Sequence, residues 1–208
     1  LYKYTINFME ESWGTKGKGI FPGCQPISIE REHFGILEKN NYVVCEKTDG
    51  TRYMMIAIQY GSQKVCVFIN RALEMFVEPL NFRMAVFKGT ILEGELYNNE
   101  FMIYDYLMTC GEVVGNQGFL ERLDHCEKTV KKAMVLRTDS ITLKVKTFHL
   151  HRDFREFMDK YLPTVKQEVD GLIFTPINEP IRIGTHNTMF KWKPRNKNTI
   201  DFLVKKGP

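Results

Sequence analysis

The sequence lacks both the long apolar run and the leader that would mark a membrane or secreted protein. No stretch of 18 consecutive apolar residues occurs, and the first residues, LYKYTINFME, have the pattern of neither a signal peptide nor a transit peptide. We therefore expect neither membrane insertion nor secretion. Since residue 1 is Leu1 and not Met, we also expect the chain to be part of a longer protein.

Cysteine is scarce, and its spacing excludes two common kinds of site. The sequence has five cysteines, an odd number, and no C-x-x-C pair that would indicate a zinc site or a redox motif. Scattered cysteines of this kind fit reduced thiols inside a cell. They are Cys24, Cys45, Cys66, Cys110 and Cys126. Internal repeats, low-complexity tracts and domain linkers are also absent, which indicates a single domain covering residues 1–208.

The composition is that of a globular domain with a weak basic excess. Hydrophobic residues make up 43% of the 208 residues and aromatic residues 12%, which is enough to bury a sizeable core. The formal net charge of +4 suits a phosphate-rich ligand or an RNA end. A basic excess that only keeps the protein in solution, with no anionic ligand, explains this charge equally well.

The pattern along the chain predicts an α+β fold built from antiparallel sheets with flanking helices. Residues 1–27 hold six glycines and prolines in their second half, which favours an irregular N-terminal arm that wraps the domain. Apolar spacing predicts helices at 29–38, with Ser28 as N-cap, and at 119–134 and 153–162. Strands are predicted at 64–76, 90–97, 100–107, 141–150, 171–175, 189–193 and 200–204.

Residues 42–58, YVVCEKTDGTRYMMIAI, are the stretch around which the site is expected. Two apolar runs flank a polar turn that holds Lys47, Asp49, Gly50 and Arg52, which predicts a strand, a loop and a strand. A hairpin with an ordinary polar turn is the simplest explanation. A lysine walled by apolar neighbours and close to Arg52 would lose proton affinity, and a neutral lysine is a nucleophile.

Acidic side chains occur at two other predicted strands. Glu93 and Glu95 lie two apart around Gly94, so both would point to one face of a strand and repel unless a cation lies between them. Alternatively, both glutamates lie on a strand face that is exposed to solvent and need no cation. Asp170 precedes Gly171 and an apolar strand, where it is either a turn residue or a metal ligand.

Cations and aromatics complete the candidate site. Alternation puts Lys191 and Lys193 on one face of a strand, where a triphosphate would receive both ammonium groups, although paired lysines also protect edge strands from aggregation. Arg71 and Lys146 are further cations near predicted strand ends. Among the aromatics of FMIYDYL, Tyr104 is the candidate to stack on a base.

Five of these segments, taken in order, resemble a known set of motifs. KTDGTR, EGELY, YDYL, DGLIFTP and KWKP are similar to motifs I, III, IIIa, IV and V of the covalent nucleotidyltransferases, and specifically of the mRNA capping guanylyltransferases. FPGCQPISIE also resembles an N-terminal segment of those enzymes. The resemblance covers residues 21–204 and implies a nucleotidyltransferase lobe of the ATP-grasp or DNA-ligase-like type.

The resemblance implies a two-step transfer. Lys47 would attack the α-phosphorus of GTP, expel pyrophosphate and hold GMP, which would then pass to the 5′-diphosphate end of RNA. The resemblance also implies a divalent cation, Mg or Mn, and a role for each candidate residue. Arg52 and Arg71 would contact ribose and phosphates, Glu95 and Asp170 the metal or ribose, Lys191 and Lys193 the phosphates, Lys146 the guanine edge, and Tyr104 the guanine face.

The sequence departs from the resembled family in one respect. Those enzymes carry a C-terminal OB-type domain with a final Arg-x-Asp-Lys motif, and nothing in this sequence matches it. We therefore expect a lobe that binds GTP but forms the lysyl adduct slowly.

Two other functions stay open at this point. One is an ATP-dependent polynucleotide ligase, and the other is a catalytically silent module that binds a partner such as a polymerase tail. For a capping enzyme, the partners implied are RNA polymerase and fused or associated triphosphatase and methyltransferase domains. The compartment would be the nucleus for a cellular protein or the host cytoplasm for a virus replicating there.

Overall fold

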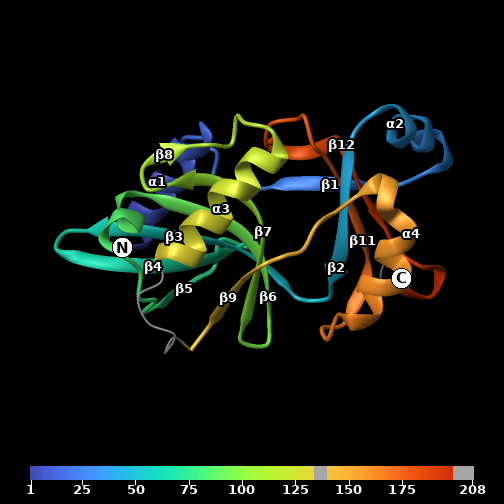
Figure 1. Cartoon of the computed structure of the whole chain (residues 1–208). Helices are drawn as coiled ribbons and strands as arrows, with labels where there is room; N and C mark the ends of the chain where they lie inside the picture. Colours follow the sequence, from blue (N-terminus) through green and yellow to red (C-terminus); the bar gives the residue numbers. More distant parts are fainter. Residues whose placement is uncertain (134–139, 199–208) are drawn as a thin grey trace, which may run out of the picture.

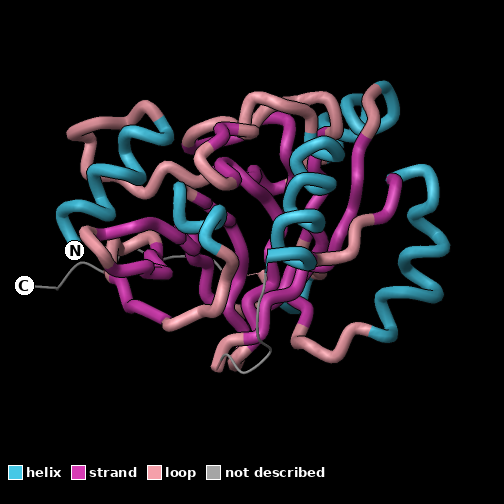
Figure 2. Tube along the Cα trace, turned by 60° about the vertical axis from the view of Figure 1, so that its left-hand side comes forward, coloured by secondary structure: helices cyan, strands magenta, loops and turns pink. Residues whose placement is uncertain are grey.

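The computed structural model describes residues 1–133 and 140–198, which form two β-sheets with helices on the outside (Figure 1). The five-stranded sheet, here called sheet A, has the order β1-β12-β11-β2-β10. The seven-stranded sheet, sheet B, has the order β5-β4-β3-β6-β7-β8, with β9 beside β7. Figure 2 shows strands in the middle of the molecule and helices around them. The predicted α+β class is confirmed.

The elements have the following bounds. Sheet A contains β1 (Cys24–Ser28), β2 (Tyr42–Thr48), β10 (His149–Leu150), β11 (Val169–Pro176) and β12 (Gly184–Trp192). Sheet B contains β3 (Thr51–Tyr60), β4 (Gln63–Asn70), β5 (Met75–Glu78), β6 (Thr90–Tyr97), β7 (Glu100–Thr109), β8 (Glu112–Val113) and β9 (Thr142–Val145). The α-helices are α1 (Tyr2–Trp13), α2 (Phe34–Lys39), α3 (Phe119–Ala133) and α4 (Phe154–Glu156), and α4 continues as a π-helical turn, Phe157–Tyr161. Short 3₁₀ turns occur at Arg31–His33, Met84–Lys88, His151–Asp153, Leu162–Thr164 and Arg195–Lys197.

Sheet B is buried on both faces around β3. Met54 and Ile56 pack in a core that includes Met9 of α1, whereas Met55 packs on the opposite face with Phe101 of β7. A strand buried on both sides needs no polar alternation, which explains the continuous apolar run in the second half of the 42–58 stretch.

The outer face of sheet A is covered by α2 and α4, and its core contains the fully buried Phe157 and Phe190. Leu37 of α2 and Phe174 of β11 pack in the same core. The predicted apolar face of segment 153–162 is confirmed, since Phe154, Phe157, Met158 and Tyr161 all belong to this core or pack against it. Covering this face by helices leaves the other face of sheet A to form one wall of a cavity.

Between the described strands the chain changes sheet twice, and both crossings are short. Asp49 and Gly50 lead from β2 in sheet A to β3 in sheet B, and residues 146–148 lead from β9 in sheet B back to β10 in sheet A. The turn at Gly50 is tight, because a Cβ there would lie 2.7 Å from the carbonyl oxygen of Leu96. The two crossings place Lys47 and Lys146 at the border between the sheets.

The predicted strand, loop and strand around Lys47 are confirmed, but the hairpin is wrong. β2 pairs with β10 and β11, while β3 pairs with β4 and β6, so the two strands that flank the turn do not pair with each other. The partners of both strands come from distant parts of the sequence, and tertiary pairing therefore overrides the local turn signal.

The irregular arm expected for residues 1–27 is wrong for Tyr2–Trp13, which form α1. Met9 and Trp13 are buried on one face of this helix, and Gly14 ends it with a φ of 66°. Ser28 is the last residue of β1 and not a helix N-cap. The helical segment starts instead at Glu30, whose side chain forms a reciprocal capping box with His33.

Two predicted strands are interrupted. The 64–76 segment divides into β4 and β5, because the Asn70 side chain accepts hydrogen bonds from the backbone of Ala72 and Glu74 and closes a turn. The 141–150 segment divides into β9 and β10, which belong to different sheets. The strand expected at 200–204 lies outside the described residues.

The remaining elements follow the sequence pattern closely. β6, β7, α3, β11 and β12 include the segments predicted for them, apart from Met134, which lies outside the described residues, and Lys193, which follows β12. Strand pairing is antiparallel except for β1 with β12 and β7 with β9. No helix in the described part of the chain is long and apolar enough to cross a membrane.

We predict that Gly171→Ala destabilises the fold by about 1–3 kcal/mol, because the added carbon would overlap neighbouring backbone. A Cβ at Gly171 would lie 2.1 Å from the carbonyl oxygen of Trp192 on the adjacent strand. Urea unfolding measures the change. Gly35→Ala, in α2 with open space around it, is the matched control and should gain stability by about 0.5–1 kcal/mol. Equal stability of Gly171→Ala and the parent would contradict the prediction.

Candidate active site

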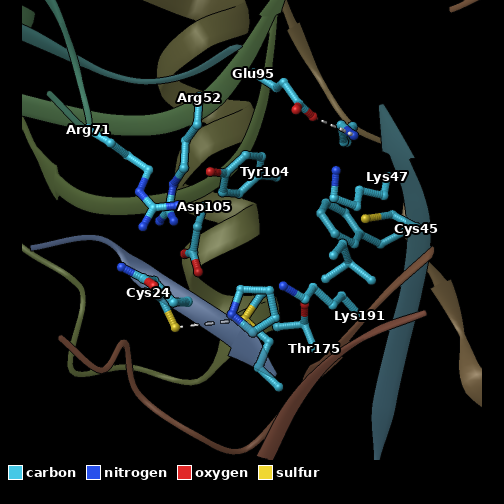
Figure 3. A pocket seen from close by; sticks show the side chains of 16 residues that line it. Cys24, Cys45, Lys47, Arg52, Arg71, Glu95, Tyr104, Asp105, Thr175 and Lys191 are labelled. Carbon is cyan, nitrogen blue, oxygen red and sulfur yellow. Dashed lines mark hydrogen bonds and ion pairs between the residues drawn. The ribbon is translucent and has the colours of Figure 1, made fainter. Parts of the chain in front are cut away.

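A cavity of about 260 Å³ lies between the two sheets and collects most of the candidate residues. Seven of the nine line it, namely Lys47, Arg52, Arg71, Glu95, Tyr104, Lys146 and Lys191. In Figure 3, Arg52 and Arg71 lie on one side and Lys47 and Lys191 on the other. The two remaining candidates, Asp170 and Lys193, are joined to this group by ion pairs.

Asp170 links two lysines at the border of the cavity. Lys47 Nζ donates to Asp170 Oδ1 at 2.9 Å and to Oδ2 at 3.1 Å, and Lys193 Nζ lies 2.7 Å from Oδ2. Burial of this carboxyl opposes its ionisation, but hydrogen bonds from Lys193 and Lys47 outweigh burial and lower the pKa of Asp170. Lys47 therefore has an anionic partner in addition to the cations expected around it.

Arg52 forms the opposite wall with a buried glutamate. Its guanidinium lies 2.7 Å from Glu93 Oε2 and packs over the rings of Phe21 and Tyr104, at 5.3 and 5.9 Å from their centroids. Burial raises the pKa of Glu93, and the charge of Arg52 opposes this shift. Burial also raises the pKa of Tyr104. Each of the two glutamates predicted to need a cation has one, since Arg52 pairs with Glu93 and Lys146 Nζ lies 4.0 Å from Glu95 Oε2.

Lys146 lies in the crossing from β9 of sheet B back to sheet A, and its side chain is only 3% exposed. Its Nζ donates to the carbonyl oxygen of Glu46 and to Thr48 Oγ1, both at 2.8 Å. It also lies 3.8 Å from Glu46 Oε1 and 4.0 Å from Glu95 Oε2. The amine is therefore directed at the strand that carries Lys47.

Glu95 and Asp170 are the two expected metal ligands, and their surroundings limit what they can hold. Glu95 accepts a hydrogen bond of 3.3 Å from the Gly50 amide, and burial raises its pKa. No cluster of three or more acidic, cysteine or histidine residues with metal-site geometry occurs within the described ranges. These residues fit a hard cation that takes one or two carboxylates and completes its shell with water and phosphate oxygens, as Mg²⁺ does.

Arg71 and Lys191 supply cations without an acidic partner. Arg71 is exposed in the turn between β4 and β5, and no ion pair joins either residue to a carboxylate in the portion the structure describes. Lys191 lines the cavity side of sheet A and Lys193 reaches Asp170 at its border, whereas Trp192 lines an apolar groove on the outer face. Unpaired cations at the mouth of a cavity favour binding of an anionic ligand.

Several lining residues are absent from the sequence-based set. Asp105 is held by the buried Arg122, with Nε to Oδ1 at 2.7 Å and a second nitrogen to Oδ2 at 3.0 Å. The thiols of Cys24 and Cys45 face the cavity, and burial raises the pKa of each to about 12. The others are Gln25, Pro26, Phe148, Ile173, Thr175 and Met189. Period-two alternation from Gly171 could have identified Ile173 and Thr175. The resemblance of FPGCQPISIE to the family gave β1 no role at the site.

The profile of the family described as mRNA capping enzyme, catalytic domain, matches residues 4–195. The chain is 28% identical over 214 residues to an mRNA-capping enzyme subunit alpha from Schizosaccharomyces pombe, covering 89% of this chain and 53% of that protein. It is 31% identical over 216 residues to an mRNA-capping enzyme from Danio rerio, covering 93% and 35%. The chain thus spans about half or less of the length of these relatives.

Solved structures share the fold at low sequence identity. The ATP-dependent DNA ligase of bacteriophage T7 in complex with ATP aligns with a TM-score of 0.56 at 13% identity, covering 84% of this chain and 69% of that one. A Lig E DNA ligase aligns with a TM-score of 0.53 at 15% identity, covering 84% and 70%. The predicted DNA-ligase-like architecture is confirmed.

We predict that Asp170→Asn removes a stabilising contribution that depends on pH. The folded-state pKa of Asp170 is lowered, so its contribution is complete above the unfolded value, near 3.9, and is lost as pH falls through the folded value. Unfolding in urea, measured for both proteins from pH 7 to pH 2.5, should give a stability difference that is constant above about pH 5 and shrinks at lower pH. A difference that stays constant down to pH 2.5 would contradict the prediction.

Proposed function

Since the chain belongs to the family of mRNA capping enzyme catalytic domains, we propose that it is an mRNA guanylyltransferase that works through a covalent lysyl-GMP intermediate. Lys47 Nζ, once deprotonated, forms a bond to the α-phosphorus of GTP, and the bond from that phosphorus to the bridging oxygen breaks to release pyrophosphate. A terminal oxygen of 5′-diphosphate RNA then attacks the same phosphorus, breaks the P–N bond and leaves the lysine free.

The position of Lys47 in the wall of a cationic cavity is the observation that carries this proposal. Lys47 Nζ donates a hydrogen bond to Asp170, and the side chains of Arg52, Arg71 and Lys191 line the same cavity as Lys47. Phosphoryl transfer depends mainly on positioning and on neutralising charge that spreads over the phosphate oxygens, and these cations supply both.

The remaining roles follow from the same placement. Arg52 and Arg71 would contact the phosphates and ribose from the cavity wall opposite Lys47, whereas Lys191 and Lys193 would contact the phosphates from the side that carries Lys47. Tyr104 would stack on the guanine, because its ring lies in the cavity wall. Reading of the guanine edge by Lys146 stays a prediction, and the hydrogen bonds of this lysine to Glu46 and Thr48 indicate an additional role.

A divalent cation, Mg²⁺ or Mn²⁺, would be held by Asp170 and Glu95 together with the phosphates of the nucleotide. When bound, it would neutralise charge on the reacting phosphate. In this structure the Asp170 carboxylate orients Lys47, and the Glu95 carboxylate accepts a hydrogen bond from the Gly50 amide in the turn.

The wider setting follows from the relatives. They come from eukaryotes such as Schizosaccharomyces pombe and Danio rerio, which favours the nucleus over the host cytoplasm of a virus. RNA polymerase and triphosphatase or methyltransferase domains are the partners we expect. A polynucleotide ligase is the second candidate, supported by the fold likeness to DNA ligases. A silent binding module is disfavoured because Lys47 and Lys193 both keep contact with Asp170.

We predict that incubation with GTP and a divalent cation adds one GMP to the protein, and that Lys47→Ala abolishes the adduct. The amine is the only group of this residue that can bond to phosphorus. Intact-mass spectrometry followed by peptide mapping measures the modification. Lys39→Ala, at the end of α2, is a matched control and should be modified like the parent protein. A label that persists in Lys47→Ala would overturn the assignment, and adduct formed from ATP in preference to GTP would favour the ligase alternative.

We also predict that a chelator stops adduct formation and that Mg²⁺ or Mn²⁺ restores it. Asp170 and Glu95 are the only acidic side chains we assign to the cation, so Asp170→Asn should raise the metal concentration needed for half-maximal adduct at least about tenfold. Titration of each cation against adduct yield, measured by mass, gives this concentration. An unchanged metal requirement in Asp170→Asn would remove this residue from the metal site.

A further inference from the structure

The strand that carries Lys47 is supported unequally on its two sides. On one side, β11 pairs with β2 along its whole length, with Gly171 opposite Lys47 and Leu172 opposite Glu46. On the other side, β10 pairs with Val43 and Val44 only. Strand pairing on this side therefore ends before the residue that we propose as nucleophile.

The ammonium of Lys146 occupies the place where this pairing stops. Its hydrogen bonds go to the carbonyl oxygen of Glu46 and to Thr48 Oγ1, so it contacts the residues immediately before and after Lys47. An ammonium carries three N–H donors, and two of them are used on β2. Within the described residues, Lys146 thus donates hydrogen bonds to a strand edge that β10 does not pair with beyond Val44.

The charge of Lys146 is balanced by a glutamate that the sequence-based set does not include. Lys146 and Glu46 are 3% and 5% exposed in their side chains, and Nζ lies 3.8 Å from Glu46 Oε1. Tyr161, from the π-helical turn, places its hydroxyl 3.5 Å from Glu46 Oε2. Buried charges persist when they are paired and hydrogen-bonded, which this arrangement provides.

We propose that Lys146 is a positioning residue for Lys47, and that Glu46 is its buried counter-ion. The inference rests on the proposed function, in which Lys47 attacks the α-phosphorus in line. Lys146 holds the free edge of β2, and this edge sets where the Lys47 backbone lies relative to Asp170 on β11. Misplacement of a reacting group by about 1 Å is enough to reduce a rate about 100-fold.

Positioning and base recognition predict different kinetic effects. If Lys146 positions Lys47, its loss lowers the rate of adduct formation at saturating GTP and leaves the GTP concentration for half-maximal rate nearly unchanged. If Lys146 acts only by reading the guanine edge, its loss weakens GTP binding and relaxes the preference for GTP over ATP, while the saturated rate stays the same.

The decisive experiment compares Lys146→Met with Lys144→Met in single-turnover adduct formation. Lys144 lies two residues earlier on β9, and its side chain, 48% exposed, pairs with Glu100. We expect Lys146→Met to lower the saturated rate about 100-fold with less than about a threefold change in half-saturating GTP, and Lys144→Met to change neither. A reduced GTP affinity with an unchanged saturated rate in Lys146→Met would overturn the proposal.

Two milder variants keep the proposal testable if Lys146→Met does not fold. Thr48→Val removes one acceptor of the ammonium, and Glu46→Gln removes its counter-charge while preserving size. Each should lower the saturated rate about tenfold without altering the GTP over ATP preference. Saturated rates equal to that of the parent protein in both variants would refute the proposal that Lys146 positions Lys47 through β2.

A readout without GTP separates this inference from the proposed function. Absence of any GTP adduct in the parent protein would refute the guanylyltransferase proposal and leave the position of Lys47 to be measured by its reaction with trinitrobenzenesulfonate. Lys47 is 25% exposed in its side chain. We expect labelling of Lys47, mapped by mass spectrometry, to be at least about threefold faster in Lys146→Met than in Lys144→Met, because the freed strand edge exposes the amine. Equal labelling rates would overturn the positioning role.

Discussion

The change of sheet between Thr48 and Thr51 is the constraint on which the rest of the site depends. β2 and β3 leave the turn at Asp49 and Gly50 in different sheets, so the cavity opens between them and Lys47 stands at its border. The turn has no room for a side chain at Gly50. The return crossing after β9 brings Lys146 to the same border, and two distant segments thereby support one strand.

Several charges in this border region are paired within the protein. Asp170 forms ion pairs with two lysines, Glu93 pairs with Arg52, and Glu46 pairs with Lys146. Removing one member of such a buried pair typically costs about 3–5 kcal/mol, because the other charge is left without compensation. Loss of one partner would therefore destabilise the fold as well as change the cavity, and the geometry of these contacts is set by strand pairing and not by flexible surface chains.

The sequence identified most elements because apolar periodicity is a local property. α3 shows this periodicity clearly. The charged and aromatic candidates were also well chosen, since seven of the nine line one cavity. Sheet membership was not predictable, because the turn at Asp49 and Gly50 looks the same whether its flanking strands pair together or with distant partners. Cys24 and Asp105 were not predicted to line the cavity, for a related reason. Their contribution depends on β1 and on Arg122 of α3, which meet the site only after folding.

The shared carboxylate of Asp170 has a consequence for how ligands would enter. Under the proposed function, a triphosphate and a divalent ion arriving together would each replace an existing contact, because the phosphates would bind Lys47 and Lys193 and the metal would bind Asp170. Association would then be an exchange of counter-ions within the site. Because binding free energies are reciprocal, each ligand would raise the affinity for the other by the same factor.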